Sequence, residues 1–386
     1  MAATERDNVG TVEDLHQSAT RMTGLADFGV DDYSDGLAVL LESYESDADL
    51  TPFGRRAARA GLRGGLAARL KCEAGWAAHP EHVAVPIERP IFVTGLPRSG
   101  TTALHRLLTA DPGHQGLELW LAEAPQPRPP RDSWAANPVF QRIQGAYAQH
   151  HVEHPEFMGV HYIAADTVEE CWQLLRQTMR SVAFECLAHL PSYSGWLQRQ
   201  DWTGPYLRHR HSLQLIGLHD ARRRWVLKNP SHLFALDALL AAYPDALVIQ
   251  THREPTAVIG SMCSLAAQAT EGWSGAFTGT VIGADQLELW ARGLGEFADA
   301  RTRHDQAQFL DIDYADFTAD PVGTVESVYA HFGLPYSGAA ADAVRSLHAA
   351  AGRDRGGAVP AHRYSLADFG LTAEQVSERF GGDKRG

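Results

Sequence analysis

Lysine is scarce in this chain. Only three of its 34 basic residues are lysines, Lys71, Lys228 and Lys384, and the 47 acidic residues leave a net charge of -13. A chain with this charge is repelled by nucleic-acid backbones and by anionic membranes. We therefore expect no nucleic-acid partner, and a lysine within an apolar run, such as Lys228, calls for a specific reason.

Closely spaced cysteines and long apolar runs are also missing. The absence of any CxxC pair argues against a disulfide framework and a zinc knuckle. The four cysteines are Cys72, Cys171, Cys186 and Cys263. No 18 consecutive uncharged apolar residues occur, and the N-terminal residues show no apolar signal core. The sequence therefore predicts a cytoplasmic protein with no membrane span.

The length of 386 residues and the 44% hydrophobic content suit one large domain with an added subdomain. We expect an N-terminal helical subdomain over 1–85 and an α/β domain over 86–386. The α/β domain is expected to carry a helical insertion at about 120–220 and a closing tail at about 351–370.

Short β-rich runs alternate with helical patterns along most of the chain. Strands are predicted at 91–94, 224–228, 246–251 and 309–312. Helices are predicted at 12–23, 33–46, 52–76, 101–110, 166–190, 201–219, 233–243 and 322–332. This alternation indicates an α/β fold with a P-loop-like, doubly wound parallel sheet flanked by helices.

The first predicted strand runs into the sequence GLPRSGTT, residues 95–102, and then into a helix. Two glycines let successive backbone N–H groups point inward, and the helix N-terminus adds the positive end of its dipole. We therefore predict an anion site, most simply for phosphate, formed by backbone amides and by Arg98, Ser99, Gly100, Thr101 and Thr102.

This loop lacks the lysine of a nucleoside triphosphate site. An ATP or GTP loop reads GxxxxGK[ST], with lysine after the second glycine. Here Thr101 takes that place, and the cation comes earlier, at Arg98. The loop therefore suits a nucleotide with a short 5′ anionic group.

A second anion site is indicated by THREPTAVIGS, residues 251–261. Arg253 would lie at the carboxyl end of a buried strand, where open α/β sheets bind ligands. Ser261 follows two helical turns later. An arginine pairing with a carboxylate is the alternative interpretation of this motif.

These motifs resemble those of the sulfotransferases that use 3′-phosphoadenosine 5′-phosphosulfate (PAPS). The likeness is to the broad bacterial branch, which is similar in its core to the tyrosylprotein enzymes. It extends over most of the chain and rests on five segments: GLPRSGTT at 95–102, WVLKNPSH at 225–232, THREPTAVIGS at 251–261, DYADFTADP at 313–321 and HRYSLADFGL at 362–371.

The resemblance implies roles for matching positions. The loop from Arg98 to Thr102 would bind the 5′-phosphosulfate, and Arg253 and Ser261 would bind the 3′-phosphate. Tyr314 would lie by the adenine, and Arg363 resembles the basic segment that closes on the 3′-phosphate. The family uses its donor without a required metal.

Sulfuryl transfer needs positive charge at the leaving phosphate and a base for the acceptor hydroxyl. Lys228, at the end of an apolar strand, suits the first task. Glu118 and His232 are the two candidates for the base. Glu118 resembles the glutamate base of the tyrosylprotein branch with an offset of one residue, and His232 resembles the lysine–histidine strand end of the cytosolic enzymes with a longer spacing.

Two other clusters carry less specific signals. The histidines around 150–154, with His161 nearby, suit a solvated loop or a pocket wall better than a metal site. The segment Glu169–Trp172 suits a pocket wall or a structural role.

The sequence thus predicts a PAPS-dependent sulfotransferase that transfers a sulfuryl group to a hydroxyl of a small organic or lipid-like acceptor. A P-loop small-molecule kinase and a non-catalytic nucleotide-binding module are the alternatives. Association with further copies of the chain is left open.

Overall fold

The computed structural model describes residues 8–153, 163–354 and 365–381. At its centre lies a parallel five-stranded sheet with the order β2-β3-β1-β4-β5. The strands are β1 (Ile91–Gly95), β2 (His114–Gln115), β3 (Arg224–Lys228), β4 (Leu247–His252) and β5 (Phe309–Asp313). The predicted α/β fold with a parallel sheet is therefore confirmed.

The three central strands are buried because helices cover both faces of the sheet. Every residue of β1 is buried, as are four of five in β3 and five of six in β4. Such continuous apolar strands are typical of parallel sheets. The register pairs Val93 of β1 with Lys228 of β3, and Gly95 with Thr251 of β4. This register brings the polar ends of three strands to one edge of the sheet.

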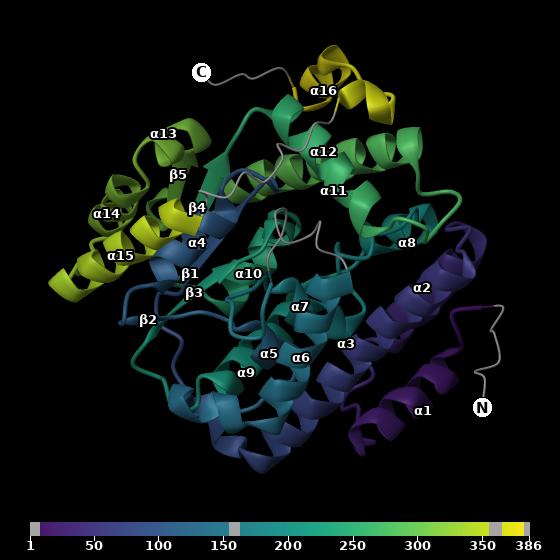
Figure 1. Cartoon of the computed structure of the whole chain (residues 1–386), viewed down its shortest axis with the longest axis horizontal. Coiled ribbons are helices and arrows are strands. Elements are labelled where there is room, and N and C mark those ends of the chain that lie inside the picture. The colour runs from purple at the N-terminus through teal and green to yellow at the C-terminus, as the bar shows by residue number, and fades with distance from the viewer. Residues whose placement is uncertain (1–7, 154–162, 355–364, 382–386) are drawn as a thin grey trace.

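Three helices precede the sheet and lie along one side of the molecule (Figure 1). They are α1 (Val12–Thr23), α2 (Ser34–Ser46) and α3 (Pro52–Ala78). Thr51 caps α3, its hydroxyl accepting from the N–H of Gly54 (3.0 Å), and Pro52 occupies the first helical position. The predicted helices at 12–23, 33–46 and 52–76 are confirmed within two residues at each end.

The helices that follow β1 surround the sheet. The longer ones among the described residues are α4 (Thr101–Thr109), α6 (Pro138–Glu153), α9 (Thr203–Ile216), α11 (Pro255–Ala269), α12 (Gly279–Arg301), α14 (Pro321–His331) and α15 (Gly338–Asp354). The shorter ones include α5 (Leu119–Glu123), α7 (Trp172–Leu175), α8 (Pro191–Leu197), α10 (Leu236–Ala242), α13 (Tyr314–Ala319) and α16 (Ala373–Arg379). Helix α4 lies directly behind the first strand (Figure 1).

The helix predicted at 166–190 is wrong. The structure has only α7 and a short 3-10 turn there, which Met179 ends with a φ of +55°. Backbone groups in this segment bond outside it: the N–H of Cys171 donates to the carbonyl oxygen of Lys228 (3.0 Å), and that of Ser181 donates to the hydroxyl of Tyr193 (3.0 Å). Tertiary partners therefore override the helical periodicity of the segment.

No helix in the described part of the chain is long and apolar enough to cross a membrane. All four cysteines carry free thiols. The hydrophobic core forms two clusters, one on each face of the sheet, and the larger joins the N-terminal helices to α11 and α12.

Candidate active site

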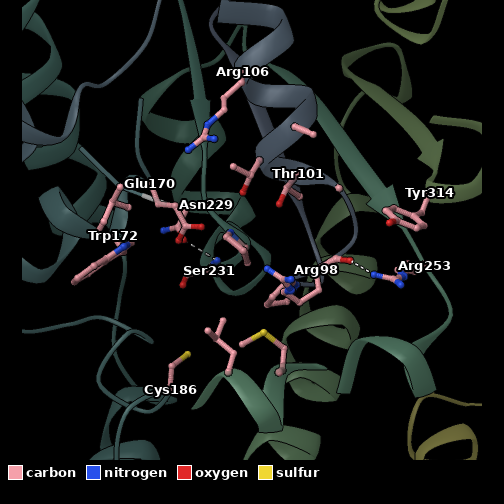
Figure 2. Close-up of a pocket in the computed structure, with 18 of the residues that line it drawn as sticks. Arg98, Thr101, Arg106, Glu170, Trp172, Cys186, Asn229, Ser231, Arg253 and Tyr314 are labelled. Carbon is pink, nitrogen blue, oxygen red and sulfur yellow. Dashed lines mark hydrogen bonds between the residues drawn. The ribbon is translucent and has the colours of Figure 1, made fainter. Parts of the chain in front are cut away.

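One large cavity lies where the strands β1, β3, β4 and β5 end. Its volume is about 1170 Å³, and its wall contains a residue within two positions of the end of each strand: Pro97 after β1, Asn229 after β3, Arg253 after β4 and Tyr314 after β5. Ligands in open α/β folds bind at this edge of the sheet. Figure 2 shows the side chains that converge on the cavity.

The loop after β1 wraps tightly around the N-terminus of α4. Gly100, the N-cap of α4, has a φ of +90°, and Arg98 has a φ of +64° in the left-handed region. An arginine there is strained by about 1 kcal/mol or more, which surrounding contacts must offset. Thr101 and Thr102 begin the helix and line the cavity. The loop therefore presents the helix N-terminus to the cavity, as an anion site requires.

The side chain of Ser99 faces away from the cavity. Its hydroxyl lies 2.6 Å from Oγ1 of Thr251 and donates to the carbonyl oxygen of Leu96. Ser99 is fully buried. Its hydroxyl therefore ties the loop to β4, and only its backbone is left to face a ligand.

The second predicted anion site adjoins the first. The guanidinium of Arg253 donates to the carbonyl oxygen of Arg98 (2.6 Å) and lies 4.2 Å from the ring centroid of Tyr314 (Figure 2). The Nε of Arg98 donates to the hydroxyl of Ser261 (3.2 Å). Four predicted donor-binding residues thus contact one another at one end of the cavity.

An ion pair lies at the wall of the cavity, with Lys228 behind the wall and Glu170 on it. The ammonium of Lys228 is 2.5 Å from Oε1 of Glu170 and donates to the hydroxyl of Thr102 (3.2 Å). Lys228 is 1% exposed, whereas Glu170 is only half-buried and lines the cavity. The scarce lysine therefore joins the phosphate loop to a carboxylate.

Backbone bonds on both sides hold Glu170 at the end of β3. The N–H of Glu169 donates to the carbonyl oxygen of Leu117 (2.8 Å), and the N–H of Cys171 donates to that of Lys228. Burial raises the pKa of Glu169 to about 7, while the nearby Lys228 opposes the shift. Glu169, which is buried, and Glu170, which is half-buried, are thus adjacent carboxyl groups in different environments.

The other end of the cavity is apolar. Met262, Leu265 and Ala269 of α11 face it, and further apolar side chains complete the wall: Ile163, Trp172, Ala183, Cys186, Leu187, Trp273 and Trp290. Such a wall suits an apolar ligand. The cavity therefore divides into a polar, cationic half and an apolar half.

The structure places Glu118 outside this cavity. Its carboxylate accepts from Nε and Nη2 of Arg128 (3.1 and 3.0 Å) and is 9% exposed. Arg128 is held in turn by Gln115, Asp220 and the face of Trp225. Glu118 thus belongs to a buried ion-pair network and does not meet the ligand cavity.

His232 is fully buried and also lies outside the cavity wall. Its Nδ1 is 2.6 Å from the hydroxyl of Tyr206. Burial, together with His209, holds the pKa of His232 well below its usual range. The imidazole is therefore neutral and packed behind the site, whereas its neighbours Asn229, Pro230 and Ser231 reach the cavity.

Some predicted residues fall elsewhere. Arg363, most of the expected closing tail, and His154 and His161 lie outside the described residues. His150 lines the cavity. Within the described ranges, no group of three or more His, Cys, Asp and Glu side chains has the arrangement of a metal site.

Sequence reasoning did not single out several polar residues of the cavity, Arg106 among them, and it gave Glu170 no chemical role. Arg106 comes four residues after Thr102 on α4, so the helical period already puts both on one face. Glu170 was assigned to a pocket wall on a helix. Its approach to Lys228 depends on a backbone bond across 57 residues of sequence, between Cys171 and Lys228, which no local pattern reveals.

The amino-acid sequence is similar to those of known proteins. The model of the sulfotransferase family matches residues 90–338, which include all five strands and the cavity loops. The chain belongs to the sulfotransferase family.

Solved structures of mycobacterial relatives share the fold of this sulfotransferase over nearly its whole length. Sulfotransferase STF1 from Mycobacterium tuberculosis H37Rv is 56% identical, with a TM-score of 0.91 over 98% of this chain and 100% of that chain. Sulfotransferase STF9 from Mycobacterium avium is 26% identical, with a TM-score of 0.87 over 98% and 96%.

Among curated proteins, this sulfotransferase is similar to the omega-hydroxy-beta-dihydromenaquinone-9 sulfotransferase Stf3 of Mycobacterium bovis and Mycobacterium tuberculosis. The identity is 27% over 251 residues. The match covers 64% of this chain and 63%, less than two thirds, of the length of those relatives.

Proposed function

We propose that this sulfotransferase transfers a sulfuryl group from PAPS to the hydroxyl of a lipid-like acceptor. The observation that carries the proposal is the contact of Lys228, which lies just behind the cavity wall, with Glu170 and Thr102, which both line the cavity. A cation, a carboxylate and a phosphate loop meet there, as transfer between an anionic donor and a hydroxyl requires.

The polar half fits the donor. The N–H groups at the start of α4 face the position of the 5′-phosphosulfate, with Thr101 and Thr102 beside them. Arg253 lies over the ring of Tyr314 and beside Arg98, which suits a 3′-phosphate flanked by an adenine. PAPS carries several negative charges, so these placed cations must offset the chain's overall charge of -13.

We assign the role of base to Glu170 in place of Glu118 or His232. Oε1 of Glu170 accepts from Lys228, and Oε2 forms no hydrogen bond with the described residues, so it is available to an acceptor hydroxyl. Glu118 is occupied by Arg128, and His232 is buried behind the cavity. A base must lie within hydrogen-bond reach of the proton that it removes, and of these three residues Glu170 alone lines the cavity.

The proposed transfer forms one bond to sulfur and breaks another. Glu170 takes the proton of the acceptor hydroxyl while the acceptor oxygen forms a bond to sulfur. The bond between sulfur and the bridging oxygen of the 5′-phosphate breaks, and adenosine 3′,5′-bisphosphate (PAP) leaves. Lys228 stabilises the charge that builds on the bridging oxygen, an effect worth about 3 kcal/mol for one well-placed donor in a dry site.

The acceptor class follows from the apolar half of the cavity. Its wall is formed mainly by aliphatic and aromatic side chains contributed by α11, α12 and the segment 163–187. An elongated hydroxylated lipid fits this wall better than a charged sugar does. The name of Stf3, which refers to a hydroxylated menaquinone, points to the same class.

The experiment is transfer of labelled sulfate from PAPS to a panel of hydroxylated lipids and sugars. We expect product with the lipids, and we expect PAP to raise the melting temperature of the protein. ATP with Mg²⁺ should give neither result. Stabilisation by ATP and Mg²⁺, with phosphoryl transfer, would favour the kinase alternative; binding of PAP without turnover on any acceptor would favour the non-catalytic module.

A further inference from the structure

The segment that leads into α3 contacts Trp273, a residue of the cavity wall. Trp273 lines the cavity and belongs to the loop that joins α11 to α12. Helix α11 runs away from the donor end: Ser261, at the middle of the helix, contacts Arg98, and Met262, Leu265 and Ala269 line the cavity. From Met262 to Ala269 the helix rises about 10 Å. Trp273, which comes after Ala269, therefore lies at the end far from the donor.

The loop of Trp273 is clamped by the segment that leads into α3. The N–H of Thr51 donates to the carbonyl oxygen of Trp273 (2.9 Å), and the hydroxyl of Thr51 donates to that of Gly272 (2.6 Å). The N–H of Gly275 donates to the carbonyl oxygen of Asp49 (2.9 Å). A strand-like bridge thus fixes the backbone on both sides of the indole.

Helix α3 leaves no room for the backbone of Trp273 to move closer to it. A Cβ on Gly54 would lie 2.7 Å from the carbonyl carbon of Trp273 and 2.9 Å from its Cα. Both distances are below any real Cβ contact, and the neighbour is backbone, which cannot rotate aside. Gly54 therefore permits the first turn of α3 to press against Trp273.

We propose that Trp273, held in place by the entry to α3, is the end wall of the acceptor cavity and limits the length of the acceptor. The N-terminal helices thereby act in substrate selection although they contribute no donor contact. The inference rests on the proposed function, because it concerns the acceptor of that same site.

The test compares acceptor length profiles of four proteins: the native chain, Trp273→Ala, Gly54→Ala and Gly61→Ala. Gly61 lies on the same helix, and a Cβ there meets nothing within 4 Å, so Gly61→Ala is the matched control. The measurement is kcat/KM for sulfation of straight-chain primary alcohols of increasing length, with labelled PAPS, together with PAP-induced thermal stabilisation.

We expect Trp273→Ala to move the optimum to longer alcohols, with about a tenfold gain for long over short ones, the size of one aromatic wall contact. Gly54→Ala, whose Cβ would displace the backbone of Trp273, should change the native length profile. Gly61→Ala should keep the native profile, and PAP should stabilise all four proteins alike. If Gly54→Ala does not fold, the acceptor length profiles of Trp273→Ala and Thr51→Ala still test the inference. Thr51→Ala removes the hydrogen bond to Gly272.

An unchanged optimum in folded Trp273→Ala, or an equal change for all lengths, would overturn the inference while leaving the proposed function in place. If instead the native chain sulfates no alcohol and PAP does not stabilise it, the proposed function itself fails. The two failures are therefore distinguishable.

Discussion

The ammonium of Lys228 lies 2.5 Å from the carboxylate of Glu170. One belongs to a central strand and the other to the segment before α7, yet the backbone bond from Cys171 to Lys228 brings them together. In the proposed mechanism, the pair would place a cation for the leaving group and a base for the acceptor within one hydrogen bond of each other. The first predictions concern these two residues.

Glu170→Gln should lower kcat by about 100-fold or more, because the amide keeps the shape of the carboxylate but cannot take the acceptor proton. PAP should still raise the melting temperature. Glu118→Gln is the control: it weakens the buried pair with Arg128, so stability should fall while turnover of the folded protein stays near native. The reverse ranking of the two kcat values would restore Glu118 as the base.

Lys228→Met should likewise reduce turnover by about 100-fold, since it removes the charge that stabilises the leaving oxygen. The donor should still bind through Arg253 and the phosphate loop. Lys71→Met provides a matched control, because the ammonium of Lys71 lies near the carbonyl oxygen of Glu123 and not beside Glu170 and Thr102. Native turnover in Lys228→Met would contradict the assigned role.

Arg253→Ala should weaken PAP binding by about 10- to 100-fold, as expected for loss of charge-assisted hydrogen bonds to a phosphate. The KM for the acceptor should not change. Calorimetric titration with PAP and with adenosine 5′-phosphate separates the 3′-phosphate from the rest of the donor. Arg303→Ala, which removes an exposed arginine paired with Asp237, should leave both values intact; equal losses for donor and acceptor would exclude a 3′-phosphate site.

Stability should depend on pH through Glu169. Burial raises the pKa of Glu169 in the folded state to about 7 from its ordinary value of 4.5, so the folded state binds the proton more tightly. The contribution of Glu169 to the free energy of unfolding is then largest below about pH 4.5. It falls as pH rises to about 7, by on the order of 2–3 kcal/mol in total. Glu169→Gln should remove this slope in urea titrations, whereas Glu326→Gln, at an exposed position, should not. A slope unchanged by Glu169→Gln would show that other groups cause it.

Chelators should leave transfer intact, because Lys228, Arg98 and the helix N-terminus supply the positive charge that the reaction needs. The measurement is turnover before and after EDTA dialysis. Loss of activity that zinc restores would overturn the metal-free mechanism.

Local sequence patterns predicted four of the five strands and the turn between β1 and α4, because these features depend on neighbouring residues; the two-residue strand β2 was not predicted. The run from Trp225 to Lys228 is apolar and short, and it is a strand in the structure. Helix α4 begins at Thr101, directly after the loop. In such segments, the sequence period and the turn chemistry decide the backbone.

The environments of Glu118 and Glu170 could not be predicted from local sequence patterns. Glu118 stands beside Trp120 in an apolar run, but its environment is set by Arg128, which reaches back from a proline-rich loop. Glu170 lies in a segment whose helical period is overridden by bonds to β3. Both outcomes depend on tertiary contacts between segments that the sequence does not link.

The two halves of the cavity come from separate stretches of chain. The proposed donor contacts come from the ends of β1, β4 and β5, whereas the apolar wall comes largely from 163–187 and from the later part of α11 with its loop. Substitutions in the wall therefore need not disturb the grip on the donor. A lineage with this architecture can acquire a new acceptor by small changes without passing through a form that has lost its source of sulfate.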